Sequence, residues 1–276
     1  MSKFLELPQA IESYVKNGDL IAMEGFTHLI PFAAGHEIIR QRIKDLTAVR
    51  LTPDLIYDQM IGAGCIKKLI FSWGGNPGVG SLHRFRDAYQ NGWPNKIEIE
   101  EHTHAGLTNR YVAGASGIGF AVLKGYSGSD LAEQTKNVSE VKSPFSDEVL
   151  TAVAAINPDV TILHAQQADK AGNVMMWGIT GVAKEAVFAA SKVIVTVEEV
   201  VEKLFKHLPR QMFTTKIQGK AMGRIISSRT LSAMKKDVTG YLYGGDISRK
   251  KKLWQQQKEG KKRLKEQGRG NVNITH

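Results

Sequence analysis

The sequence predicts an α/β fold built on an open, mostly parallel sheet that helices cover on both faces. Short apolar runs with the length of buried strands alternate with segments whose apolar residues recur at helical spacing. Continuous apolar runs are typical of strands that are covered on both faces, as in parallel sheets. The composition, 42% hydrophobic and 23% charged over 276 residues, is that of a globular protein and not of a disordered or fibrous chain.

The elements are expected in the following order. A first helix is predicted over residues 7–17, because Leu7, Ile11 and Val15 share one helical face and Asn17-Gly18 closes the segment. Further helices are predicted from Pro31, over 53–63 and from 81 to about 91. Strands are predicted at 20–23, 46–52, 66–72, 97–101, 120–123, 160–164 and 192–197.

Charge divides the chain into two parts. Residues 205–276 hold 18 Lys or Arg and 4 Asp or Glu, whereas residues 1–204 hold 19 and 23. The net charge of +10 therefore comes from a strongly basic C-terminal part, and the remainder is weakly acidic. We predict two units, a domain of residues 1–204 and a basic helical appendage of residues 205–276, whose functions have to be argued separately.

The composition also bears on location and chemical class. The single cysteine, Cys65, excludes an internal disulfide framework and a metal site built from cysteines. No run of 18 apolar residues occurs, so no membrane-spanning helix is expected. Residues 1–19 contain no apolar run behind a basic start, so no signal peptide is expected and the cytoplasm is the expected location.

Four loops are the expected positions of a ligand site, because ligands of parallel sheets bind at the carboxyl ends of strands. They are residues 24–31, 72–81, 101–109 and 164–173, although the first, second and fourth alone also fit ordinary turns. The glycines of "GGNPGVGS" could present N–H groups to an anion, but the loop has neither a P-loop lysine nor G-x-G-x-x-G spacing. His102 and His104, at a strand end, are expected to point the same way, yet they lack a third zinc ligand. Two interpretations of His102 and His104 remain: they form hydrogen bonds to a substrate, or they are a buried pair whose hydrogen bonds are satisfied.

Five segments, taken together and in order, carry a specific resemblance. They are "GDLIAMEGFTHLIPFAAGHEIIRQ", "NPGVGSLHRFRDA", "EEHTHAGLTNRYVAGASG", "ILHAQQADKAGNVMMWG" and "VIVTVEEVVEKL". Over about residues 1–204 they resemble the α, or A-type, subunit of family I coenzyme A transferases of the glutaconate and 3-oxoadipate type. The resemblance implies an open α/β layer fold and transfer of coenzyme A between carboxylic acids through a glutamyl thioester. It also implies a heteromer in which the β subunit supplies the nucleophilic glutamate, with coenzyme A or acyl-CoA as substrate and no permanently bound cofactor or metal.

The same resemblance places the substrate-binding residues, while no catalytic residue is expected in this chain. They are Gly25, Phe26, Thr27, His28, Asn76, Gly78, Gly80, Ser81, His102, Thr103, His104 and Gln166. A carboxylate is a weak nucleophile, so a site that attacks a thioester needs orientation and oxyanion stabilisation, which glycine turns and hydroxyls can supply across an interface. Glu24 stands where the wider family has a second glycine and is not expected to be catalytic. Glu198 and Glu199 are expected in the first turn of a helix rather than as nucleophiles.

The basic part resembles a different family. The residues that carry this resemblance are "YGGDISRKKKL" and "QKEGKKRLK", with shorter matches at 209–211 and 235–238. Over about residues 206–268 they look like the C-terminal end of LepA-type translation factors, which are ribosome-associated GTPases. The sequence has no P-loop, so no GTPase activity is expected. "VEKL" at 201–204 fits both the end of the first segment and the start of the second, and a junction there would produce this chain.

A basic helix is predicted over residues 247–267, with Asp246 as its N-cap. Its apolar stripe is sparse, so an exposed helix that attracts phosphates is expected. Contact with RNA is favoured because the segment resembles one that lies against ribosomal and transfer RNA. A solvated helix without a partner and a membrane-surface helix are the weaker alternatives. The residues expected to contact nucleic acid are Arg249, Lys250, Lys251, Lys252, Lys258, Lys261, Lys262, Arg263 and Lys265.

Three functions are compatible with these features. The leading hypothesis is the α-type subunit of a CoA-transferase that requires a β partner. The alternatives are an RNA- or ribosome-binding protein that acts through the basic tail, and a protein with the transferase fold that hydrolyses a CoA thioester or cleaves a carbon–carbon bond. Acyl-CoA chemistry that is lost on changing loops 76–81 or 102–104 would indicate the first. Salt-sensitive RNA affinity that is lost on deleting 246–268 would indicate the second.

Overall fold

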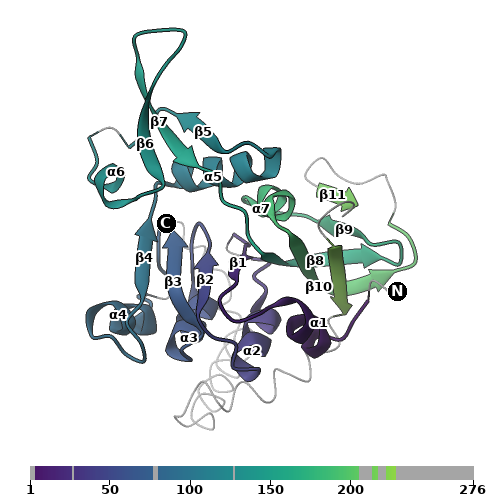
Figure 1. Ribbon diagram of the computed structural model, residues 1–276. Coiled ribbons are helices and arrows are strands. Elements are labelled where there is room, and N and C mark those ends of the chain that lie inside the picture. Colours follow the sequence, from purple (N-terminus) through teal and green to yellow (C-terminus); the bar gives the residue numbers. More distant parts are fainter. Residues whose placement is uncertain are drawn as a thin grey trace, which may run out of the picture. The chain divides into compact units, whose positions relative to one another are not determined.

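The computed structural model describes residues 4–26, 28–76, 80–126 and 128–204, together with the backbone of residues 213–216 and 222–227 (Figure 1). These residues belong to one compact unit, Met1–Thr230, which contains a large sheet, a small sheet and the helices that pack on them. The predicted basic helix at 247–267 and all of its proposed nucleic-acid contacts lie outside the described residues.

The large sheet is mostly parallel. From one edge its strands follow in the order β4–β3–β2–β1–β8–β10–β12, and all neighbours in this series run parallel. β9 pairs antiparallel with the end of β8, and β11 pairs antiparallel with β9. The bounds are β1 Leu20–Met23, β2 Leu46–Val49, β3 Ile66–Phe71, β4 Glu98–Glu101, β8 Val160–Asp169, β9 Asn173–Met176, β10 Lys192–Val201, β11 Phe213–Lys216 and β12 Met222–Ser227.

Helices cover both faces of the large sheet (Figure 1). On one face α2 approaches so closely that a Cβ at Gly35 would overlap Ile56 of α3 and lie 3.2 Å from Met23 of β1. On the other face α5 and α7 pack over β1, β2 and β3 in an apolar cluster that includes Val49 and Leu107. The bounds are α1 Leu7–Tyr14, α2 Phe32–Arg40, α3 Leu55–Gly62, α4 His83–Gln90, α5 His104–Ser116, α6 Leu131–Gln134 and α7 Ala183–Ala189.

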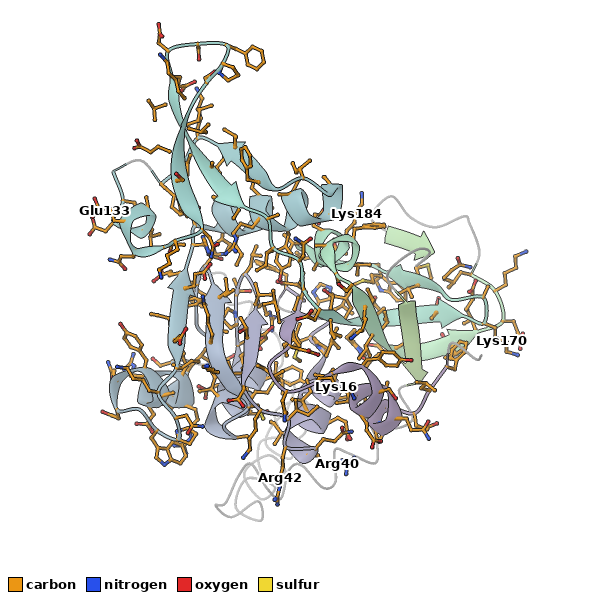
Figure 2. All side chains as sticks on the ribbon, in the orientation of Figure 1. Lys16, Arg40, Arg42, Glu133, Lys170 and Lys184 are labelled. Carbon is orange, nitrogen blue, oxygen red and sulfur yellow. The ribbon has the colours of Figure 1, made fainter. Side chains whose placement is uncertain are left out.

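A small antiparallel sheet follows α5 along the chain, with the strand order β5–β7–β6. Its strands are β5 Phe120–Leu123, β6 Val138–Lys142 and β7 Val149–Ala154. Ala113 of α5 packs with Tyr126 and Val153 in the core of this part. Figure 2 shows Lys170 at the periphery, where its side chain is exposed; Lys184 of α7 is exposed as well.

The predicted fold class is confirmed, since the sheet is mostly parallel and has helices on both faces. All seven predicted strands and all four predicted helices are present, most with bounds shifted by a few residues. The strand at 120–123 has the predicted bounds, but it belongs to the small antiparallel sheet. None of the helices in the described part of the chain combines the length and the apolar character needed to span a bilayer.

Two of the four predicted loops are wrong in part. Residues 104–109 are helical, because α5 begins at His104 after Thr103, whose hydroxyl caps the helix by accepting a hydrogen bond of 2.9 Å from Gly106 N. The predicted loop 164–173 is mostly strand. β8 continues to Asp169, and only residues 170–172 connect it to β9.

The helix predicted to begin at Glu198 and Glu199 is also wrong. Both residues lie in β10, which continues to Val201. The strand is long because the equally long β8 pairs with it as far as Val201 opposite Asp169. Backbone pairing with a long neighbour therefore overrides the local signal of two acidic residues after an apolar run.

Residues beyond 204 take part in the large sheet. β12 extends the parallel series at β10, from Lys192 opposite Met222 to Val197 opposite Ser227. This pairing crosses the boundary that the charge distribution predicts after residue 204. The division into units 1–204 and 205–276 stays a prediction.

Candidate functional site

The loop after β1 is a compact turn at the carboxyl end of the sheet. A Cβ at Gly25 would lie 2.6 Å from Leu29 O, so a larger residue does not fit unless the loop moves. Phe26 and His28 pair as an isolated antiparallel bridge, and Leu29 has φ +57°. A left-handed conformation costs a non-glycine residue roughly 1–3 kcal/mol. The described residues of this loop, Gly25, Phe26, His28 and Leu29, are therefore held in a tight conformation by their surroundings; Thr27 lies outside the described residues.

His28 and Gln166 converge on the backbone of Trp177. His28 Nδ1 lies 2.9 Å from Phe26 O, and its Nε2 lies 3.3 Å from Trp177 O. Gln166 of β8 donates from Nε2 to Trp177 O over 3.1 Å and accepts from Trp177 N over 3.2 Å. A Cβ at Gly178, where φ is +97°, would overlap His28 Nε2. The structure thus joins predicted site residues from the loop after β1 and from β8.

A buried polar cluster lies next to the loop 25–29. Glu24, the first residue after β1, accepts a hydrogen bond of 2.8 Å from Tyr111 Oη of α5. Arg50, the first residue after β2, donates from Nη2 to Gly25 O over 2.7 Å, and its Nη1 lies 3.0 Å from Asp54 Oδ1. Glu24 is 3% exposed and Arg50 only 1%. The buried Arg50 side chain therefore holds the start of the loop, and Tyr111 fixes Glu24 beside it.

Burial raises the pKa of Glu24 to about 7. The positive charge of Arg50 opposes this rise, as do hydrogen bonds from Tyr111 and from the backbone N–H groups of Leu51 and Gly25. Strongly perturbed carboxyl groups in the interior concentrate at functional sites. We therefore include Glu24 in the candidate site, although its side chain does not reach the surface.

The loop after β3 is attached to the loop after β2. Trp73 N donates to Leu51 O over 3.1 Å, and Gly75 N donates to Pro53 O over 3.2 Å. Arg50, in the same β2 loop, contacts Gly25. The loops after β1, β2 and β3 therefore form one connected layer at the carboxyl end of the sheet.

Asn76 and Gly80 join the two ends of the glycine-rich loop. Their backbones exchange hydrogen bonds of 3.2 and 3.1 Å, and Gly80 has φ +114°. Ser81 is exposed, with its Oγ 3.5 Å from Arg86 Nη2. Residues 77–79, including the predicted Gly78, lie outside the described residues. The ends of this loop thus meet shortly before α4.

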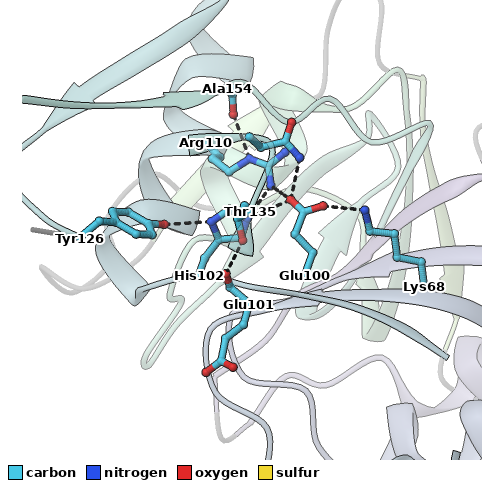
Figure 3. Close-up of polar contacts among 9 residues, drawn as sticks. Lys68, Glu100, Glu101, His102, Arg110, Tyr126, Thr135 and Ala154 are labelled. Atoms are coloured by element: carbon cyan, nitrogen blue, oxygen red, sulfur yellow. Dashed lines mark hydrogen bonds and ion pairs between the residues drawn. The ribbon is translucent and has the colours of Figure 1, made fainter. Parts of the chain in front are cut away.

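His102 belongs to a buried network centred on Glu100 (Figure 3). The partners of Glu100 are Lys68 Nζ (2.6 Å), Asn137 Nδ2 (2.8 Å), His102 Nε2 (2.9 Å) and Arg110 Nη1. His102 Nδ1 lies 2.9 Å from Tyr126 Oη. Burial opposes ionisation of Glu100, but its cationic and hydrogen-bonding partners prevail and lower its pKa far below the usual range. Burial lowers the pKa of His102.

These contacts describe His102 as a satisfied buried group, and its role in substrate binding stays a prediction. Arg110 also donates from Nε to Ala154 O of β7 over 2.9 Å. The network therefore connects β3 and β4 of the large sheet with α5 and the small sheet. Its position indicates that it maintains the arrangement of these elements beside the site.

Thr103 and His104 do not share a surface with His102. Thr103 caps α5, and His104, the first residue of that helix, is exposed. The expectation that His102 and His104 point the same way from a strand is wrong, because β4 ends at Glu101. Within the described ranges, no group of three or more His, Cys, Asp or Glu residues could hold a metal ion.

Glu198 and Glu199 contact the neighbouring strand β8. His164 Nε2 lies 3.5 Å from Glu198 Oε1, and Gln167 donates to Glu199 Oε2 over 2.7 Å. These cross-strand contacts account for the two carboxyl groups as parts of the sheet. They give neither residue the role of a nucleophile.

Arg50, Tyr111 and Trp177 belong to the site in the structure but were not among the predicted site residues. Arg50 carried a signal that could have found it, since it interrupts an apolar run and a buried cation must be paired. Tyr111 and Trp177 carried no such signal. Their contacts exist only because α5 and β9 are placed beside the loop after β1 by the tertiary fold.

The fold and the site together define a class of protein. Three connected loops, one of them glycine-rich, lie at the carboxyl end of a mostly parallel sheet. Beside them, the imidazole of His28 and the amide of Gln166 contact the same carbonyl oxygen, that of Trp177. Over residues 4–214 the chain matches the family model described as Coenzyme A transferase, and it belongs to this family. The family predicted from the five ordered segments is thereby confirmed.

Relatives and solved structures agree with this assignment. The A-type subunit of 3-oxoadipate CoA-transferase from Pseudomonas knackmussii is 61% identical over 204 residues, which cover 74% of this chain and 72% of that protein. The crystal structure of glutaconate CoA-transferase from Acidaminococcus fermentans has a TM-score of 0.72 at 30% identity, covering 82% of this chain and 75% of that one. The decarboxylase AibA/AibB has a TM-score of 0.70 at 26% identity, with 82% and 83% covered.

The C-terminal part matches a second family model. Residues 182–276 match the model described as GTP-binding protein LepA C-terminus, which confirms the resemblance predicted for the basic part. This chain spans only 11–19% of the length of the related translation factors. The two matches overlap over residues 182–214, which include "VEKL".

Proposed function

We propose that this chain is the A-type subunit of a heteromeric CoA-transferase, which transfers coenzyme A between two carboxylic acids through a glutamyl thioester on a partner β subunit. The 61% identity to the A-type subunit of a 3-oxoadipate CoA-transferase carries this proposal. Coenzyme A and acyl-CoA are substrates in this scheme, and no permanently bound cofactor takes part. The partner supplies the nucleophile, and this chain supplies the surface that orients the substrate.

The connected loops support the part assigned to this chain. Attack of a carboxylate on a thioester places negative charge on the carbonyl oxygen, and donors that are already in place stabilise that charge most effectively. Gln166 holds the Trp177 backbone at both its N–H and its C=O group, so the His28 ring lies against a fixed carbonyl oxygen. We assign substrate orientation to this His28–Gln166 pair and to the loops 25–29 and 76–81.

The other predicted site residues differ in their exposure. Ser81 and His104 are exposed and accessible to a ligand, whereas His102 acts from the interior. A cytoplasmic location agrees with a chain whose single cysteine, Cys65, is buried as a free thiol. Residues 246–268 lie outside the described residues, so the structure does not support contact with RNA. The comparisons do not support it either, and RNA contact is not part of this proposal.

Co-expression with the β subunit of a 3-oxoadipate-type enzyme tests the proposal. The two chains are expected to elute together in size exclusion and to exchange coenzyme A between an acyl-CoA and a free carboxylic acid. The β chain by itself serves as the first control, and a complex whose partner glutamate is changed to glutamine serves as the second. Chains that elute separately, or a complex without exchange, would contradict the proposal.

A second candidate function is favoured by one observation, the structural similarity to the AibA/AibB decarboxylase. A scaffold that lies between transferases and a decarboxylase can hold an acyl-CoA for cleavage instead of exchange. The same complex distinguishes the two chemistries. Decarboxylation or hydrolysis releases carbon dioxide or free coenzyme A without an acceptor acid, whereas transfer requires the acceptor.

A further inference from the structure

A strand from the C-terminal part of the chain pairs with the edge of β10. β12 lies beyond residue 214, where the match to the CoA-transferase family model ends, and within residues 182–276, which match the model of the LepA C-terminus. It runs parallel to β10 over Lys192–Val197. This part of β10 is apolar, and Val193 and Val195 are buried in a cluster that includes Val187 of α7. Without a neighbour on this side, β10 would present unpaired backbone groups beside an apolar core, which promotes association between chains.

The backbone groups of β10 alternate between its two neighbours. Lys192 N donates to Asp159 O, just before β8, over 3.1 Å, so the N–H group of Lys192 and of every second residue after it faces β8. The N–H groups that face β12 are those of Val193, Val195 and Val197. The two sides of β10 can therefore be observed separately.

β11 supports the strand that leads to the candidate site. It pairs antiparallel with β9, and Phe213 lies opposite Met176, the residue before Trp177. The carbonyl oxygen of Trp177 is the group that His28 and Gln166 both contact. β9 is thus paired with β8 on one side and with β11 on the other, up to the residue that precedes this shared group.

The backbone groups of β9 alternate in the same way. Asn173 N binds Asp169 Oδ1 over 2.9 Å, and Trp177 N binds Gln166 Oε1 over 3.2 Å, so both N–H groups point toward β8. That of Met175, midway between them, points the same way. The N–H groups that face β11 are those of Val174 and Met176.

We propose that β11 and β12 are structural parts of the CoA-transferase subunit, in which β12 closes the edge of β10 and β11 positions Trp177 through β9. The division between the two units of the chain then falls after Thr230, where the compact unit that contains both strands ends, and not after residue 204. Leu231–His276 remains as the separate basic unit. The role of β11 in positioning Trp177 rests on the proposed function, whereas the closing of the two edges does not.

Hydrogen exchange of the full chain, followed residue by residue by NMR, tests both pairings without need for activity. After correction for intrinsic rates, the amides of β10 that face β12 are expected to exchange within about tenfold of the alternate amides that face β8. The amides of β9 that face β11 are expected to match that of Met175 in the same way. Amides that face β11 or β12 but exchange as fast as those of an open edge would overturn the proposal.

A pair of proline variants tests β12. Val193 faces β12 and lies opposite Gly223, so it bonds with the residues on either side of Gly223, and the N–H group of Ile226 therefore faces β10 while that of Ile225 faces away. Among the described strands, β12 pairs only with β10. Ile226→Pro removes a hydrogen bond of the ladder, whereas Ile225→Pro removes an N–H group on the outer side, where proline is tolerated.

The two variants are expected to differ at the amides of β10 that face β12. In Ile226→Pro these amides should exchange at least about tenfold faster than in the wild type, and in Ile225→Pro they should stay within about threefold of it. Equal effects of the two substitutions would overturn the role of β12.

A second pair of proline variants tests β11. Thr215 lies opposite Val174, whose backbone groups face β11, and Thr214 lies opposite Met175, whose groups face away. Residues that face each other in an antiparallel pair exchange two hydrogen bonds, so the N–H group of Thr215 faces β9 and that of Thr214 does not. In the complex with the β subunit, Thr215→Pro is expected to lower kcat/KM for CoA exchange at least about tenfold, and Thr214→Pro by no more than about twofold.

A double variant separates positioning from a general loss of structure. If β11 acts through Trp177, Thr215→Pro should cause no more than about a twofold further loss in a chain that carries Gln166→Ala, because the Trp177 backbone is already released. A further tenfold loss in that background would overturn the positioning role. A wild-type complex without CoA exchange would reject the transferase function alone, because hydrogen exchange of the amides that face β11 and β12 still decides whether the two edges are closed.

Discussion

His28 and Gln166 contact the same carbonyl oxygen, that of Trp177, from the loop after β1 and from β8. The imidazole lies 3.3 Å from this oxygen and the amide nitrogen 3.1 Å. Gln166 also accepts from Trp177 N, so the Trp177 backbone is held at both its N–H and its C=O group. The orientation of the histidine thus depends on a residue far away in the sequence, and this dependence can be measured.

Replacing Gln166 by alanine removes both hydrogen bonds to the Trp177 backbone. The free energy of unfolding should fall by about 1–3 kcal/mol, from two neutral hydrogen bonds. CoA exchange by the complex should also fall, by at least about tenfold, because a displaced His28 no longer orients the substrate. Gln167→Ala is the matched control, since the neighbouring amide contacts Glu199 and not the site. Equal losses in both variants would argue against the role assigned to Gln166.

Gly178→Ala tests the space beside the histidine. The residue has φ +97°, and an added Cβ would overlap His28 Nε2. Strain and displacement together should lower stability by roughly 1–3 kcal/mol and also lower exchange activity. Gly119→Ala is the control, because nothing lies within 4 Å of a Cβ at that position. Urea unfolding of the two variants measures the difference, and an unchanged Gly178→Ala protein would contradict the packing described here.

Glu100→Gln tests the network that joins the two sheets. Loss of this carboxylate leaves Lys68 and Arg110 as buried or partly buried cations, which should cost about 3–5 kcal/mol at pH 7. The folded-state pKa is depressed, so the stabilisation is present above the ordinary value of 4.5 and is lost as pH falls below it. The variant should therefore lose less stability than the wild type between pH 7 and pH 3. Glu98→Gln, an exposed change on the same strand, should leave the unfolding curve unchanged at both pH values.

Glu24 should affect stability in the opposite direction. Its folded-state pKa is raised from 4.5 to about 7, so the folded chain keeps a proton that the unfolded chain has released over this window. Stability of the wild type should fall as pH rises through the window, by up to about 3 kcal/mol. Glu24→Gln removes this term, and unfolding measured from pH 4 to pH 8 should show the variant gaining stability relative to the wild type. A variant that loses stability relative to the wild type as the pH rises would contradict this sign.

The sequence predicts the parallel core well because local pattern and tertiary environment agree there. The apolar runs at β1, β2 and β3 are buried strands with nearly the predicted bounds. The prediction fails where a long-range partner decides. β8 and β10 stay extended through polar residues because each pairs with the other. The antiparallel strands β6 and β7 were not predicted; β6 is mostly polar, whereas β7, with the sequence VLTAVA, carried an apolar signal that was missed.

The candidate site shows the same contrast between residues that a local sequence signal identifies and residues whose role depends on tertiary contacts. Gly25, His28 and Gln166 could be selected from the sequence because they stand in ordered family segments. Arg50 carried only the signal of a cation that interrupts an apolar run, and nothing in the sequence singled out Tyr111 within its segment. Their contacts with Gly25 and Glu24 arise only when β2 and α5 lie beside β1. His102 and His104 share a segment but not an environment, because the cap at Thr103 turns one inward and leaves the other exposed.

Intact-mass spectrometry of the co-expressed complex after incubation with an acyl-CoA shows which of the two chains carries the covalent intermediate. We expect a hydroxylamine-sensitive coenzyme A adduct on the β partner, formed only when this chain is present, and no adduct on this chain. An adduct on this chain, or the same adduct on the partner alone, would contradict the assignment of this chain as the subunit that completes a site on its partner.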